Sequence, residues 1–137
     1  MINKGSTRDV VDKLNSYSLM QKNIEYVEKK IKIVENELSK IRVSNFEENR
    51  GKANNYRIEK LLDEKTKLFN KLNDLKLEKK FIVEAINSLE AIEREIIIDF
   101  YFKKYSVLKI SSNKNYSERY IRKIRANALL KLLMYLN

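Results

Sequence analysis

The chain of 137 residues carries a net charge of +10 at neutral pH, from 29 Lys and Arg against 19 Asp and Glu. It contains no Cys, His, Trp or Pro and only two Gly, so there are no residues for disulfides, for Cys/His zinc sites or for Ser-His and Cys-His nucleophile pairs. We therefore expect neither an enzyme nor a protein with a cofactor, a metal or a small-molecule substrate. No stretch approaches the ~20 apolar residues of a membrane span, and we expect a cytoplasmic protein without membrane contact.

A heptad pattern of apolar residues begins early in the chain. One set is Tyr17, Ile24, Ile31 and Leu38, and the companion set is Met20, Val27, Val34 and Ile41. Spacings of three and four place both sets on one seam of a long helix. Polar residues that can cap the helix precede Val10 and Val11. The pattern predicts a helix over about residues 8–43.

A second heptad pattern follows a polar stretch. The polar stretch 44–55 is rich in Asn and contains Gly51, a composition typical of a loop, and we expect this loop over residues 44–53. Leucine or isoleucine then recurs every seven residues, at Leu61, Leu68, Leu75, Ile82 and Leu89, with Ile58, Leu72 and Ile86 in the companion set. This pattern predicts a second helix over about residues 54–86. Two such helices joined by a short loop bury each other's apolar stripes as an antiparallel hairpin, closed within one chain or between two chains.

Four further apolar residues lie off the predicted seam, at Leu62, Phe69, Leu77 and Phe81. A two-helix hairpin buries little area, so these extra positions favour self-association, with a dimer as the first expectation. We therefore interpret residues 1–87 as a coiled-coil oligomerisation segment.

The positive charge is concentrated near the C-terminal end. Residues 100–137 hold nine basic side chains and one acid, Glu118, which gives this stretch a net charge of +8. A polyanionic partner is the direct electrostatic interpretation, and a solvated basic surface is the alternative.

Residues 88–137 have the pattern of a helix-turn-helix domain. The segment 87–90 resembles a helix start, and two further helices are predicted over 106–114 and 117–135. Between them Asn115 suits a turn position with positive φ, Tyr116 is expected to be buried between the helices, and Ser117 can cap the last helix. That helix has Ile121, Ile124, Ala128 and Leu132 on one side and basic residues on the other, the division that a helix in the major groove needs.

The residues from Leu89 to Leu132 also resemble a known family. The matching residues are Glu93-Arg94-Glu95-Ile96-Ile97, Tyr101, Ile110-Ser111, Asn115-Tyr116-Ser117, Ile121, Ala128 and Leu132. Together they resemble the sigma-70 region 4 type of helix-turn-helix. With a preceding helical hairpin, the chain is similar to the phage and prophage transcriptional regulators of the ArpU and RinA type.

The resemblance implies an all-α fold, a long antiparallel coiled-coil hairpin followed by a sigma-70 region 4-like helix-turn-helix, and a sequence-specific DNA-binding regulator of late phage genes. It assigns the groove-facing positions of the recognition helix to Ser117, Glu118, Arg119, Arg122 and Lys123. Charge and proximity in sequence make Lys103, Lys104, Lys109, Lys114 and Arg125 the candidates for phosphate contacts. The implied partner is double-stranded DNA in a nucleoid-associated setting, and contact with RNA polymerase is left open.

Two alternatives use the same elements. A small terminase subunit also joins a helix-turn-helix to a helical oligomerisation segment and would serve DNA packaging. A coiled-coil adaptor would bind RNA polymerase or another protein without contacting DNA.

Overall fold

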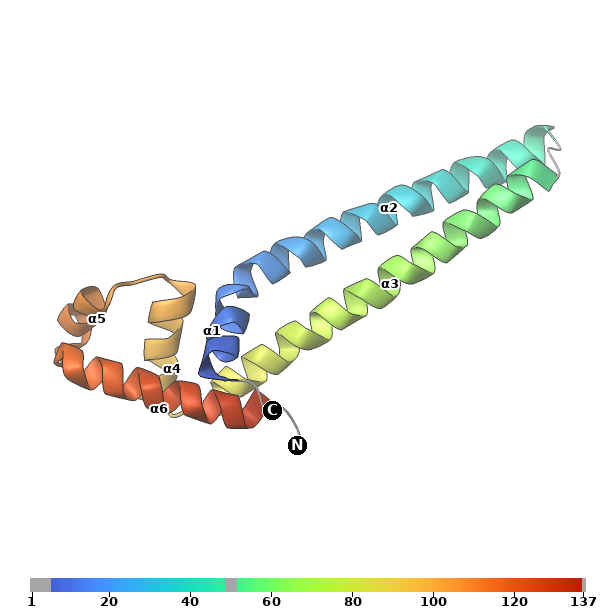
Figure 1. Ribbon diagram of the computed structural model, residues 1–137. Helices are drawn as coiled ribbons and strands as arrows, with labels where there is room; N and C mark the ends of the chain where they lie inside the picture. Colours follow the sequence, from blue (N-terminus) through green and yellow to red (C-terminus); the bar gives the residue numbers. More distant parts are fainter. Residues whose placement is uncertain (1–5, 49–51, 137) are drawn as a thin grey trace. The chain divides into compact units, whose positions relative to one another are not determined.

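The computed structural model describes residues 6–48 and 52–136, with side chains described for 6–43 and 55–136 (Figure 1). Every regular element in these ranges is helical, which confirms the predicted all-α class, and no β-strand occurs among them. In chain order the elements are α1 (Thr7–Asn15), α2 (Tyr17–Glu48), α3 (Lys52–Asn87), α4 (Ala91–Ile97), the π-helical segment η1 (Ile98–Phe102), α5 (Val107–Lys114) and α6 (Glu118–Leu136).

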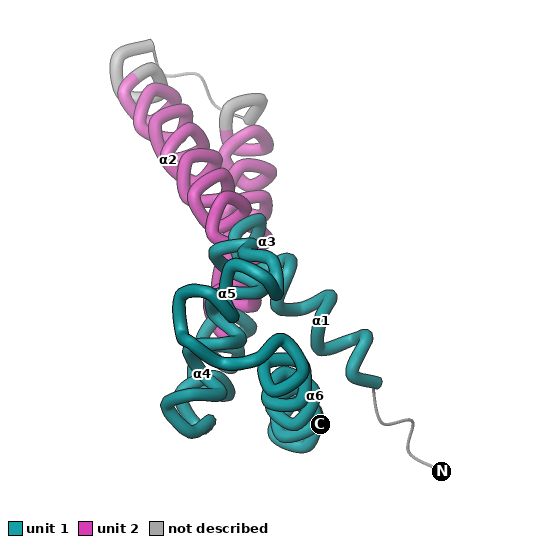
Figure 2. The backbone as a smooth tube through the Cα atoms, turned by 90° about the vertical axis from the view of Figure 1, so that its left-hand side faces the viewer, with its two compact units in different colours: residues 1–20, 78–137 teal, residues 21–77 magenta. Residues whose placement is uncertain are grey.

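The chain forms two compact units, drawn in different colours in Figure 2. Residues 21–77 make the hairpin unit, and residues 1–20 together with 78–137, as far as they are described, make the terminal unit. Both ends of the chain therefore contribute to one compact unit, and the hairpin unit is an insertion between them. This division differs from the predicted domain boundary between residues 87 and 88.

Within the hairpin unit, α2 and α3 lie side by side (Figure 1), and they pack along a single apolar seam. Two clusters make up the seam. One joins Ile24, Val27 and Ile31 to Leu72, and the other joins Val34, Leu38 and Ile41 to Leu61. The residue numbers rise along α2 as they fall along α3, so the two helices are antiparallel. The apolar stripe of α2 is thus buried by α3 of the same chain, as the heptad spacing favours.

The predicted helix over 8–43 is wrong at Ser16, where α1 ends before α2 begins. The Ser16 hydroxyl donates to the Lys13 carbonyl at 2.9 Å, and its backbone N–H donates to the Asp12 carbonyl at 3.0 Å. A serine side chain that bonds locally to the backbone competes with regular helix propagation. In addition, α1 packs on α6 and η1, so its buried Val10 and Leu14 belong to the terminal unit and not to the hairpin seam.

The predicted loop over 44–53 is also too long. Helix α2 continues to Glu48 and α3 begins at Lys52, while residues 49–51 of the predicted loop lie outside the described residues. Asn and Ser are weak helix formers but each costs at most about 0.7 kcal/mol relative to Ala. A cooperative helix that is already packed along a seam can therefore extend through several of them.

The terminal unit has its core where α4, α5 and α6 meet. Ile96, Ile110, Ile121 and Ile124 form one buried cluster, with the partly buried Ile92, Phe100, Tyr105 and Val107 packed against it. The predicted helix start at 87–90 is displaced, because α4 begins at Ala91 with Glu90 as its N-cap. Ser88 does not cap this helix, since its hydroxyl donates backwards to the Ala85 carbonyl at 2.6 Å.

Segment η1 adds a wider helical turn at the end of α4. The Lys103 N–H donates to the Ile98 carbonyl at 2.9 Å, which is the five-residue hydrogen bond of a π-helix. The segment places Phe102 against Tyr17, with ring centres 4.6 Å apart and nearly parallel planes. The chain then leaves the helix through Lys104, which has a positive φ of 59°.

Candidate nucleic-acid interface

The connection between α5 and α6 is a short turn built from polar residues. Ser106 caps α5, its Oγ accepting the Lys109 N–H at 3.1 Å. Helix α5 ends at Asn115, which adopts the left-handed conformation with φ 59° and ψ 34° that Asn tolerates better than most residues. Ser117 then begins α6, because its Oγ accepts the Tyr120 N–H and its carbonyl accepts the Ile121 N–H. The turn is also tied across by the Ser111 hydroxyl, which donates to the Tyr116 carbonyl.

The inner sides of α5 and α6 are apolar and tightly buried. Ile110 of α5 and Ile121 of α6 are both 0% exposed, and Ile124 is 8% exposed. Ala128 and Leu132 continue the buried stripe of α6 at 0% exposure. The buried stripe fixes the rotation of α6 about its axis, and so decides which side chains face outward.

The five residues assigned to groove reading all lie on the exposed part of α6 or at its start. They are Ser117, Glu118, Arg119, Arg122 and Lys123. The Arg122 guanidinium lies 4.0 Å from the Glu118 carboxylate, one turn earlier. Within the described residues no carboxylate pairs with Arg119 or Lys123.

Three of the predicted phosphate-contact residues, Lys103, Lys104 and Lys109, are exposed beside Tyr105 or α1. The Lys109 ammonium lies 4.0 Å from the centre of the Tyr105 ring, and the Lys103 ammonium lies 5.8 Å from it. Lys104 donates to the Asn15 Oδ1 at 2.8 Å. An aromatic face or an amide oxygen orients a cation without neutralising it, so the charges of Lys104 and Lys109 remain available to an anion.

The other two, Lys114 and Arg125, are partly buried and take part in internal contacts. The Lys114 ammonium lies 2.9 Å from Glu95 Oε2 and 3.8 Å from Asp99 Oδ2. The Arg125 guanidinium lies 4.5 Å from the centre of the Phe100 ring. Burial raises the pKa of the Tyr101 hydroxyl above its ordinary value, and the charge of Arg125 partly opposes this rise.

Tyr116 and Tyr120 form an exposed aromatic pair at the start of α6. Their ring centres are 4.9 Å apart, and the side chains are 42% and 44% exposed. The expectation that Tyr116 is buried between the helices is therefore wrong, because isoleucines from α4, α5 and α6 already fill that space.

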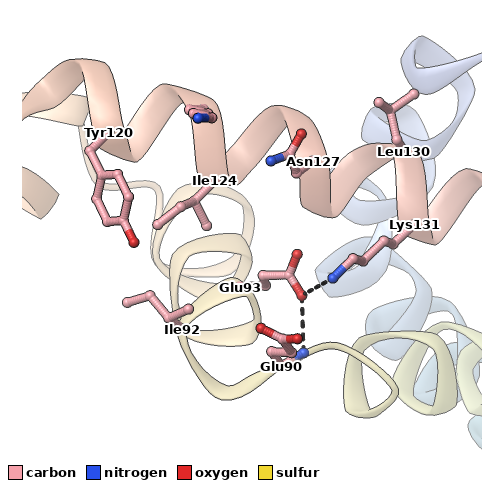
Figure 3. A pocket seen from close by; sticks show the side chains of 9 residues that line it. Glu90, Ile92, Glu93, Tyr120, Ile124, Asn127, Leu130 and Lys131 are labelled. Atoms are coloured by element: carbon pink, nitrogen blue, oxygen red, sulfur yellow. Dashed lines mark hydrogen bonds and ion pairs between the residues drawn. The ribbon is translucent and has the colours of Figure 1, made fainter.

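A pocket of about 460 Å³ lies between the start of α4 and the side of α6 (Figure 3). Its lining residues are Glu90, Ile92, Glu93, Tyr120, Lys123, Ile124, Asn127, Leu130 and Lys131. Of these, Lys123 is one of the residues assigned to groove reading and Tyr120 belongs to the exposed aromatic pair, so the pocket adjoins the candidate interface.

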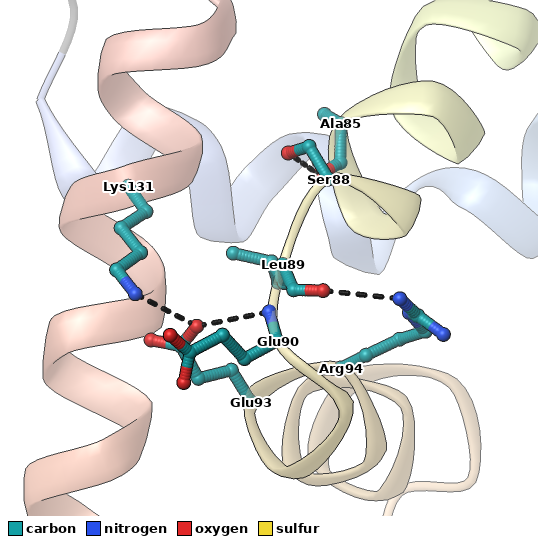
Figure 4. Close-up of polar contacts among 7 residues, drawn as sticks. All are labelled: Ala85, Ser88, Leu89, Glu90, Glu93, Arg94 and Lys131. Carbon is teal, nitrogen blue, oxygen red and sulfur yellow. Dashed lines mark hydrogen bonds and ion pairs between the residues drawn. The ribbon is translucent and has the colours of Figure 1, made fainter.

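A buried acid, Glu93, connects the start of α4 to α6 at the edge of this pocket (Figure 4). Glu93, whose side chain is 7% exposed, accepts the Glu90 N–H at 3.1 Å and the Lys131 ammonium at 2.9 Å. The hydrogen bond to Glu93 raises the pKa of Lys131. Sequence reasoning missed this pair, although a Glu three residues into a helix is a recognisable capping signal.

None of the described helices is long and apolar enough to cross a membrane. In the part of the chain that the structure describes, no three acidic side chains are grouped so that they could hold a metal ion. No protein-family model matches this chain, and no curated protein or solved structure matches it either.

Proposed function

We propose that this chain is a sequence-specific DNA-binding transcription regulator, in which α5, the turn at Asn115 and α6 act as a helix-turn-helix of the sigma-70 region 4 type. The observation that carries the proposal is the outward side of α6, where Arg119 and Lys123 are exposed and have no carboxylate partner among the described residues. A recognition helix needs free donors of this kind for base edges and phosphates.

The distribution of ion pairs supports an anionic partner. Of the nine basic residues after Phe100, Lys103, Lys114, Arg122 and Lys131 have a carboxylate within 4.0 Å. The other five, as far as the described residues go, do not; they are Lys104, Lys109, Arg119, Lys123 and Arg125. If these five neutralise phosphates, log affinity falls with log salt at a slope of about −4.5, at about 0.9 per phosphate.

The resemblance to ArpU- and RinA-type regulators supports a role in the late genes of a phage or prophage. In this proposal a dimer formed through the hairpin presents two copies of α6 to two half-sites. Pairing raises the affinity of a small module and fixes the half-site spacing. Contact with RNA polymerase would be an addition to this DNA contact.

The test is selection of bound fragments from random DNA, followed by substitution of the outward side of α6. Arg119→Ala together with Lys123→Ala should weaken binding to the selected sequence about 5- to 150-fold for each lost base contact, from the ~1–3 kcal/mol of a specific pair. Lys29→Ala with Lys32→Ala removes the same charge from exposed positions of the hairpin unit and should leave this affinity within about twofold.

The outcomes separate the candidate functions. Unchanged sequence preference in the α6 variant would refute groove reading by these residues. No retardation of any DNA at low salt would favour the adaptor, and a ring of many subunits in light scattering would favour DNA packaging.

A further inference from the structure

Helix α3 carries apolar residues that the hairpin seam does not use. Leu62 and Phe69, seven residues apart, are 41% and 40% exposed, whereas the seam residues Leu61 and Leu72 are 8% and 6% exposed. At about 100° per residue, Leu62 and Phe69 lie in one row beside the seam. The two heptad sets of α3 already supply the two apolar rows that a seam with one neighbouring helix needs. A third apolar row is typical of a helix that packs against two neighbours. Helix α2 is one neighbour, and the structure describes no other against this row.

The row extends along the outer side of α3 at alternating spacings of three and four. Its members are all exposed, and we call them the α3 edge: Asn55, Glu59, Leu62, Thr66, Phe69, Asn73 and Lys76. Thr66 lies at the centre, four residues after Leu62 and three before Phe69. When the edge is placed against an antiparallel copy of itself, each Leu62 faces a Phe69, each Glu59 comes opposite an Asn73 and each Lys76 comes opposite an Asn55. The apolar residues therefore meet apolar residues of the second copy, and no like charges of the edge face each other.

We propose that the α3 edge is the homodimer interface, with two α3 helices packed antiparallel about a two-fold axis at Thr66. An interface of this symmetry uses one surface twice and closes on itself. The centre tolerates burial, because the Thr66 hydroxyl already donates to the Leu62 carbonyl at 3.0 Å. The neighbouring Lys65 ammonium lies 3.8 Å from Glu35 of α2 and 5.8 Å from the centre of the Phe69 ring, so its charge is directed to its own chain.

Introduced cysteines test the position of the axis, because the natural chain has none. In the full chain, Thr66→Cys should form covalent dimers on oxidation, or with a bismaleimide that spans the ~8–10 Å between packed helix axes. Glu64→Cys is the matched control, since Glu64 is also exposed but lies about 200° around α3 from Leu62. The cross-linked fraction should be at least fivefold higher at position 66. Equal cross-linking, or more at position 64, overturns the proposed axis.

A charge on the α3 edge tests the interface itself. Phe69→Glu should raise the dimer dissociation constant at least tenfold in sedimentation equilibrium, while helix content is kept because Phe69 lies outside the buried seam. Lys71→Gln changes the net charge by the same amount on the opposite exposed side of α3 and should leave the constant unchanged. A wild-type chain that stays monomeric, or a dimer that survives Phe69→Glu, overturns the proposal.

This inference gives a defined surface to the dimer within the proposed function. The cross-linking and sedimentation experiments contain no DNA, so a negative result in them would leave the proposed contact between α6 and DNA standing. Conversely, DNA affinity that is insensitive to Arg119 and Lys123 would leave the dimer interface standing.

Discussion

The substitution Lys114→Met tests whether this cation stabilises the terminal unit or contacts the phosphates of the proposed DNA partner. The substitution keeps a long unbranched stem and removes the ammonium that lies 2.9 Å from Glu95 and 3.8 Å from Asp99. The side chains of Lys114 and Asp99 are only 19% and 11% exposed, so water screens their attraction poorly. Lys103 remains 3.6 Å from Asp99 but is 54% exposed and compensates in part. Lys114→Met leaves the nearly buried Asp99 with Lys103 as a weak partner, and this should lower the free energy of unfolding by about 1–3 kcal/mol.

Urea unfolding followed by tyrosine fluorescence measures this loss in the relevant unit. Six of the eight tyrosines lie in the terminal unit, at Tyr17, Tyr101, Tyr105, Tyr116, Tyr120 and Tyr135. The salt dependence of DNA binding by Lys114→Met, measured under conditions where the variant is folded, should keep the wild-type slope. Lys109→Met is the matched control, because Lys109 is exposed and, among the described residues, contacts an aromatic face and no carboxylate. Lys109→Met should change the free energy of unfolding by less than about 0.5 kcal/mol, and it should reduce the slope of log affinity against log salt by about 0.9.

The opposite pattern would refute this reasoning. If Lys114→Met unfolds at the wild-type urea concentration and reduces the salt slope as Lys109→Met does, Lys114 contacts phosphate and its ion pairs contribute little. A rescue experiment sharpens the test. Asp99→Asn should recover part of the stability lost in Lys114→Met, because it removes the unpaired charge, whereas in the wild-type background the same change should destabilise the terminal unit.

Three further outcomes follow from the packing and the charges of the terminal unit. Ile121→Ala leaves a cavity at a side chain that is 0% exposed and should cost about 2–5 kcal/mol in urea unfolding, with loss of DNA binding at temperatures where the wild type is folded. The bond to Glu93 raises the pKa of Lys131, so Lys131 stabilises the fold through this bond only while it is charged. The difference in unfolding free energy between wild type and Lys131→Met should therefore be full below pH 10.5, the ordinary lysine pKa, and should vanish as the pH rises through the raised value. A difference that persists in alkali would show that Lys131 acts through packing of its stem. Replacing residues 21–77 with a short Gly/Ser linker should leave a folded terminal unit, judged by retained cooperative unfolding, and a non-cooperative product would contradict the division into two units.

The hairpin was predictable because its main signal is periodic and local. Every member of the two sets between Met20 and Ile41 is buried, since a heptad pattern directly encodes a seam. The companion helix was less clear, as Lys65 and Lys79 interrupt its pattern and Leu68 and Leu75 are only partly buried. The extent of the loop could not be derived from composition, because weak helix formers are tolerated in a helix that packing already stabilises.

The candidate interface was predictable in outline only. The turn at Asn115 and the cap at Ser117 follow from local chemistry, and the structure has both. The environment of each cation depends instead on residues far away in the sequence. Lys114 meets Glu95 nineteen positions earlier, and Lys131 meets Glu93 thirty-eight positions earlier. Charge counting treats all of these lysines alike, so it could not separate those that are neutralised within the fold from those that no described carboxylate neutralises.

The apolar residues of α1 already indicate in the sequence that α1 is separate from α2. Val10 lies seven residues before Tyr17 and so continues one heptad set, which suggests an unbroken helix. In the companion set, however, the position seven before Met20 is Lys13, and the buried residue is Leu14 instead. The apolar side therefore shifts just before Ser16, and the shift indicates that α1 packs against different elements.

The Asn15–Lys104 hydrogen bond and the Tyr17–Phe102 stack join this part of the chain to η1 and the turn that follows it. Because α6 and η1 pack against α1 from the opposite end of the chain, a fragment beginning at residue 88 would lack part of its own fold. The proposed DNA binding would therefore depend on both ends of the chain.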